Sequence, residues 1–99
     1  MTYLTIIYQL SPNGIFNLSN LEWLDISKNK ITEIGSGIDQ LTKLTTLDLS
    51  NNDIQELPDE ICRLENLLAL DLRGNLKLMD NEILEDYLNS KKILSYYFR

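Results

Sequence analysis

The chain has 99 residues, enough for a single domain (1–99) with a modest hydrophobic core. Its formal net charge of −6 argues against nucleic acids and anionic membranes as partners and makes a basic protein the more natural one. The single cysteine, Cys62, excludes an internal disulfide, and the N-terminus lacks the basic stretch of a signal peptide, so we expect a cytoplasmic, intracellular location.

The first predicted element is a short strand near the N-terminus. Leu4 and Ile6 are separated by one polar residue, which is the period of a strand. Ile15 and Leu18 then lie at the spacing expected for a return segment. We interpret residues 1–20 as a degenerate first coil whose strand leaves one edge of a sheet open.

A regular unit begins at Leu21 and recurs at Leu44 and Leu67, so that its starts lie 23 residues apart. Each unit opens with L-x-x-L-x-L or its isoleucine variant, in which apolar residues alternate as in a short strand. Because similar units stack, these strands are predicted to form a parallel sheet. The unit boundaries are placed at 21–43, 44–66 and 67–79.

The second half of each unit predicts a short helical turn on the opposite side of the coil. Ile61 and Leu64 are three residues apart, and Ile38 and Leu41 take the same places one unit earlier. We expect these side chains to meet the strand leucines in a common core.

Residues 80–99 are predicted to form a helical C-terminal cap over the last unit. Two apolar sets occur at helical spacing on either side of Asn89-Ser90. The first set is Ile83, Leu84, Tyr87 and Leu88, and the second is Ile93, Leu94, Tyr97 and Phe98.

The repeated sequence motif resembles the leucine-rich repeat, in particular the intracellular 23-residue class found in Ras-scaffold proteins and plant intracellular Ras-group repeat proteins. The stretch Leu57-Pro58-Asp59-Glu60-Ile61 and the tail Lys92 to Arg99 are similar to segments of that class. The resemblance implies an α/β solenoid of about four coils, with the sheet on the concave side. It also implies that Asn29, Asn52 and Asn75 satisfy backbone groups in the turns.

The side chains between the strand leucines are expected on the concave face, where such proteins hold a partner protein. Trp23 is the favoured anchor, since tryptophan is prominent among binding hot spots, and Tyr3 is expected beside it. The full set of predicted protein-binding residues is Tyr3, Glu22, Trp23, Asp25, Lys28, Thr46, Asp48, Asp71 and Arg73.

No catalytic, metal or cofactor site is predicted. The chain has no histidine, which excludes Ser-His-Asp and Cys-His devices, and no glycine-rich phosphate loop. The acidic column Asp25, Asp48 and Asp71 follows from the ordinary L-D-L-S wording of the repeat class, so we interpret it as attraction for a basic partner rather than a cation site.

Two other functions stay open at this stage. Comparable arrays precede the nuclease domain of catabolite-repression-type deadenylases, so the chain fits the targeting portion of a larger enzyme. A structural subunit buried in a large assembly is the other alternative. For the open N-terminal edge the readings are a covering segment, a homodimer through that edge, or a longer array.

Overall fold

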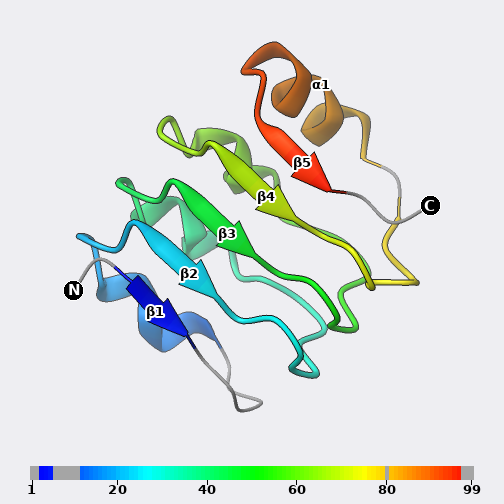
Figure 1. The fold of residues 1–99 in the computed structure, drawn as a ribbon, viewed down its shortest axis with the longest axis horizontal. Coiled ribbons are helices and arrows are strands. Elements are labelled where there is room, and N and C mark those ends of the chain that lie inside the picture. Colours follow the sequence, from blue (N-terminus) through cyan, green and yellow to red (C-terminus); the bar gives the residue numbers. More distant parts are fainter. Residues whose placement is uncertain (1–2, 6–11, 80, 97–99) are drawn as a thin grey trace.

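The computed structural model describes residues 3–5, 12–79 and 81–96 and contains one parallel five-stranded sheet. The strands lie side by side in chain order (Figure 1). They are β1 (Tyr3–Thr5), β2 (Trp23–Asp25), β3 (Thr46–Asp48), β4 (Ala69–Asp71) and β5 (Leu94–Tyr96). The predicted parallel sheet is therefore present.

Short helices form a second layer behind the sheet, each next to its neighbour in chain order. They are the 3₁₀ helices η1 (Pro12–Asn17), η2 (Ser36–Gln40) and η3 (Asp59–Arg63), and the α-helix α1 (Glu82–Ser90). Gly35 and Pro58 precede η2 and η3 with almost the same extended backbone, at φ −69° and −71°. Proline is fixed near this φ, and glycine can adopt it as well, so glycine is tolerated at the equivalent place.

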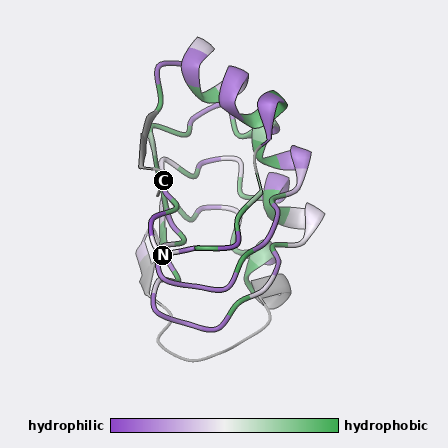
Figure 2. Ribbon diagram, turned by 90° about the vertical axis from the view of Figure 1, so that its right-hand side faces the viewer, coloured by the Kyte–Doolittle hydropathy of each residue, from purple (hydrophilic) through white to green (hydrophobic). Residues whose placement is uncertain are grey.

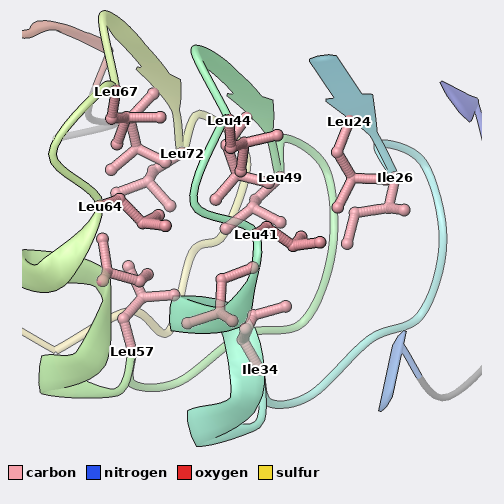
Figure 3. Close-up of a cluster of buried hydrophobic side chains, with 14 of the residues drawn as sticks. Leu24, Ile26, Ile34, Leu41, Leu44, Leu49, Leu57, Leu64, Leu67 and Leu72 are labelled. Carbon is pink, nitrogen blue, oxygen red and sulfur yellow. The ribbon is translucent and has the colours of Figure 1, made fainter. Parts of the chain in front are cut away.

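The hydrophobic core fills the space between the two layers (Figure 3). Leu24, Leu47 and Leu70 from the strands are fully buried, as are Ile38 and Ile61 from the 3₁₀ helices. Figure 2 shows hydrophobic residues facing the interior and hydrophilic residues on the outer surface of the helices. Burial of each side chain of this size contributes about 1.5–3 kcal/mol to the free energy of folding, so the regularly spaced leucines are a main source of stability.

A series of buried asparagines joins successive units on one side of the sheet. Asn52 donates from Nδ2 to the carbonyls of Leu49 in its own unit, at 3.1 Å, and of Ile26 in the preceding unit, at 3.0 Å. The next asparagine of the series makes the same two kinds of bond. The structural role expected for these residues is confirmed, because buried turns otherwise leave carbonyls unpaired.

The residue before each of these asparagines has a left-handed backbone. Lys28, Asn51 and Gly74 have φ values of 58°, 57° and 79°. A side chain costs about 1–2 kcal/mol in this conformation, so only Gly74 adopts it without strain. The asparagine after each left-handed residue donates from Nδ2 to the carbonyl of the residue three positions before it.

The C-terminal cap differs from the prediction in two respects. The helix is present over Glu82–Ser90, but Leu94–Tyr96 is a strand that pairs with β4, not a continuation of the helix. Ile83 is exposed, whereas the other three apolar residues of the first predicted helical set are buried. Tyr97 and Phe98 lie outside the described residues.

The end of α1 gives the physical reason for the first difference. Lys92 adopts a left-handed φ of 54°, and its N–H donates to the carbonyl of Asn89 at 3.2 Å. The N–H of Ile93 donates to the carbonyl of Leu88 at 2.9 Å, and both side chains are buried. These bonds form a Schellman motif, which stops the helix and turns the chain toward the open edge of β4.

Candidate protein-binding surface

Trp23 and Tyr3 form an aromatic pair on the face of the sheet that points away from the helices. The two residues are register partners in β2 and β1. Their ring centroids lie 4.8 Å apart with an interplanar angle of 59°. The side chains are 46% and 49% exposed, so the pair is accessible to a partner. The prediction that Tyr3 lies beside Trp23 is confirmed.

The register continues the pair into a column across the sheet. Trp23 is opposite Thr46, and Thr46 is opposite Ala69. Thr46 and Ala69 are small and half-buried. The aromatic pair therefore lies beside the shorter side chains of Thr46 and Ala69 in this column.

The predicted acidic column is present beside it. Asp25, Asp48 and Asp71 are consecutive register partners. Asp25 Oδ1 accepts from the N–H and the hydroxyl of Ser27 at 3.0 and 2.6 Å, and Asp48 accepts the same two bonds from Ser50. This Asp-x-Ser turn at the ends of β2 and β3 explains why the Asp and Ser of the L-D-L-S motif recur together.

Asp71 differs because an arginine replaces the serine. Arg73 donates to it from Nε at 3.1 Å and from a terminal guanidinium nitrogen at 2.8 Å. Burial alone would raise the pKa of the Asp71 carboxyl, but the hydrogen bonds and charge of Arg73 outweigh burial and lower this pKa. Among the described residues, Asp25 and Asp48 have no ion pair, so the negative charge of the column is concentrated next to Trp23.

The two other predicted site residues lie just outside β2. Glu22 is exposed and its carbonyl accepts from the N–H groups of Thr45 and Thr46 at 2.7 and 3.1 Å. Lys28 is exposed in the left-handed turn, and its N–H donates to the carbonyl of Ser50 at 3.0 Å. Glu22 directly precedes β2 and Lys28 follows its end by three residues.

Cys62 lies on the opposite side of the molecule, in η3. Burial, and then the negative charge of Asp59, raises the pKa of the Cys62 thiol above its ordinary value. A raised pKa keeps sulfur as the weakly nucleophilic thiol. Tyr87 lies in the same region, where its hydroxyl donates to the carbonyl of Leu64, and burial raises its pKa as well.

Two surface features were not predicted from the sequence. Leu76 is a highly exposed leucine, and a groove separates residues 56–59 from Met79, Asn81, Glu82 and Ile83. The sequence signal for the groove is the four-residue spacing of Met79 and Ile83, but periodicity alone assigned Ile83 to the core.

Neither a metal centre nor a membrane span is found in the described parts of the chain. Over residues 3–5, 12–79 and 81–96, no three His, Cys, Asp or Glu side chains are grouped so that they could hold a metal ion. Within the same ranges, every helix is too short or too polar to cross a membrane.

Comparison with known proteins agrees with this geometry. A family profile described as a leucine-rich repeat region matches residues 4–88. A solved leucine-rich repeat protein of Leptospira interrogans is similar to this chain, with 36% sequence identity and a TM-score of 0.74. The match covers 91% of this chain, which spans 22% of the length of that protein. No curated protein matches the chain.

Such repeats generally act as protein-interaction modules and are typically non-enzymatic. The 23-residue spacing, the asparagine series, the parallel strands and the matching family profile lead to one assignment. The chain belongs to the leucine-rich repeat family.

Proposed function

We propose that this chain is an intracellular protein-interaction module that binds a basic partner protein on the concave face of its sheet. The observation that carries the proposal is the exposed Trp23–Tyr3 pair beside Asp25 and Asp48, two carboxylates that have no ion pair within the described part of the chain. The remaining proposed contacts are Glu22, Lys28, Thr46, Asp71 and Arg73.

The physical argument rests on how aromatic and acidic groups act together. Trp23 and Tyr3 offer large, rigid surfaces that lose little conformational entropy on binding. The aromatic faces also attract a lysine or arginine of the partner through cation–π interaction. The charges of Asp25 and Asp48 add to this attraction and speed the encounter with a basic surface.

Within this proposal the repeat units form one solenoid domain. The units 21–43, 44–66 and 67–79 follow the degenerate first coil, which gives about four coils, and residues 80–99 complete the last one. The ladder of bonds between residues 23 apart, such as Leu68 N–H to Thr45 O at 2.7 Å and Thr45 N–H to Glu22 O at 2.7 Å, supports this arrangement.

The test is a pull-down from source-cell lysate with wild type and Trp23→Ala, followed by mass spectrometry. We expect a partner that the wild type captures and Trp23→Ala loses. Leu68→Ala is the matched control, since Leu68 is also exposed, at 67%, but lies outside the aromatic pair. Circular dichroism and thermal unfolding of both variants establish that the fold is kept.

Retention of the partner by a folded Trp23→Ala variant would reject the aromatic pair as the anchor. Loss in Asp25→Asn/Asp48→Asn with retention in Glu65→Gln would support the basic character of the partner. A transcript that extends beyond Arg99 into a nuclease domain would instead favour the targeting portion of a larger enzyme. A dimer that depends on β1 would favour association through the N-terminal edge.

A further inference from the structure

A groove lies on the side of the molecule away from the Trp23–Tyr3 pair, where the segment before α1 passes the start of η3. It has a volume of about 560 Å³, within the range of roughly 300–1,000 Å³ typical of ligand sites. A smaller hollow of about 290 Å³ shares Glu56 and Met79 with it and extends to Glu33. We call the two hollows together the side groove.

Met79 and Ile83 give the side groove an apolar wall. They are 57% and 60% exposed, although the structure holds their backbone firmly. The N–H of Met79 donates to the carbonyl of Gln55 at 2.8 Å. The Asn81 side chain accepts from the N–H of Leu84 at 3.1 Å and caps α1, so Ile83 lies in a fixed first turn. Exposed apolar side chains on such an ordered surface favour contact with another molecule.

The charged side chains around this wall are acidic. Glu33, Glu56, Asp59 and Glu82 line the two hollows, and among the described lining residues there is no lysine or arginine. A nucleic acid or an anionic membrane would be repelled. A second copy of this chain is also a poor occupant, because it carries 15 acidic and 9 basic residues.

We propose that the side groove is a second docking surface, for a basic polypeptide segment that places an apolar side chain between Met79 and Ile83. Lysine or arginine residues on either side of that apolar residue pair with Glu56 and Asp59 in one direction and Glu82 in the other. Glu33 extends the acidic path for a longer segment. This surface is separate from the aromatic pair, so it acts independently of the proposed concave-face function.

The test uses the full chain and a fluorescein-labelled peptide in which one leucine is flanked by lysines and arginines. We expect saturable binding by fluorescence anisotropy at low salt, with amide shifts in NMR spectra confined to the neighbourhood of residues 55–59 and 79–83. Replacing the leucine of the peptide by serine, at unchanged charge, should weaken binding about tenfold.

Paired variants separate the groove from general attraction to an acidic protein. Met79→Ser/Ile83→Ser and Glu56→Gln/Glu82→Gln should each weaken binding about tenfold. The control Glu65→Gln/Asp86→Asn removes the same charge at exposed sites outside the groove and should change affinity by less than about twofold. Trp23→Ala should bind the peptide like wild type, which keeps this test distinct from that of the concave face.

The proposal is overturned if the charge control weakens binding as much as the groove variants, or if the amide shifts centre on the sheet face. It is also overturned if wild type fails to bind, or if sedimentation reveals a dimer that the groove variants abolish. Thermal unfolding checks each variant. If the serine pair unfolds, the glutamine pair, which retains side-chain volume, still decides the outcome.

Discussion

The carboxamide oxygen of Asn52 accepts a hydrogen bond at 3.1 Å from the backbone N–H of Asn29, 23 residues earlier in the chain. The same oxygen accepts from the N–H of Ile31 at 3.2 Å, and all three residues are buried. One side chain thus satisfies donors of the preceding unit while its nitrogen satisfies carbonyls of both units. The link between units is polar as well as hydrophobic.

Asn52→Ala should therefore be among the most destabilising single changes. It leaves several buried backbone groups without a partner, each costing about 1–3 kcal/mol, so we expect a loss of about 3 kcal/mol or more in the free energy of unfolding. Urea denaturation followed by circular dichroism measures it. Asn66→Ala is the control: Asn66 is exposed and donates once, to the carbonyl of Thr42, so its loss should stay below about 1 kcal/mol. Equal effects would reject the special role of Asn52.

Gly74→Ala should also destabilise the fold, through two distinct causes. A Cβ at Gly74 would lie 2.2 Å from Oδ1 of Asn51, and the φ of 79° costs a residue with a side chain about 1–2 kcal/mol. A double-mutant cycle with Asn51→Gly separates them, because removing the Asn51 side chain relieves the contact but not the backbone strain. We expect Gly74→Ala to cost less in the Asn51→Gly background. An equal cost in both backgrounds would show that backbone strain alone, and not the contact with Asn51, causes the destabilisation.

The sequence predicted the sheet because the fold is built from one repeated spacing. Once Leu24, Leu47 and Leu70 are aligned, every residue between them is aligned too, which is why the contact of Tyr3 with Trp23 could be predicted without coordinates. The acidic column followed from the same register. Its charge at one end depends in addition on Arg73, which the register places two residues beyond Asp71 and which pairs with it in the structure.

The parts that the sequence failed to predict depend on single backbone conformations or on contacts between distant segments. The strand at 94–96 was missed because Lys92 stands where a glycine usually signals the end of a helix. The side groove was missed because it needs the loop before α1 to lie against residues 56–59, an arrangement fixed by the bond from Met79 to Gln55 rather than by periodicity.

Lys92→Gly should stabilise the protein, in contrast to most surface changes. Glycine removes the cost of the left-handed φ of 54° at the end of α1, while its greater freedom in the unfolded chain offsets part of the gain. We expect a net increase of about 0.5–1 kcal/mol in the free energy of unfolding. Lys91→Gly is the matched control, because Lys91 has a right-handed helical backbone with φ −90° and gains nothing from glycine. Stabilisation by both, or by neither, would contradict the Schellman assignment.

The reactivity of Cys62 should depend on pH in a way that reports its surroundings. Burial first, and the charge of Asp59 second, raise the pKa of the Cys62 thiol above its ordinary value, so less reactive thiolate is present at a given pH than in the unfolded chain. The same shift means that Cys62 stabilises the fold at pH values below the pKa of the unfolded thiol, and that this contribution is lost as the pH rises through the folded pKa.

Iodoacetamide labelling of Cys62 between pH 7 and 10 should show a higher midpoint in the folded protein than in urea. Asp59→Asn should lower the midpoint, whereas Glu65→Gln should leave it unchanged. A folded midpoint at or below the unfolded one would show that the surroundings of Cys62 in η3 do not raise the pKa of its thiol.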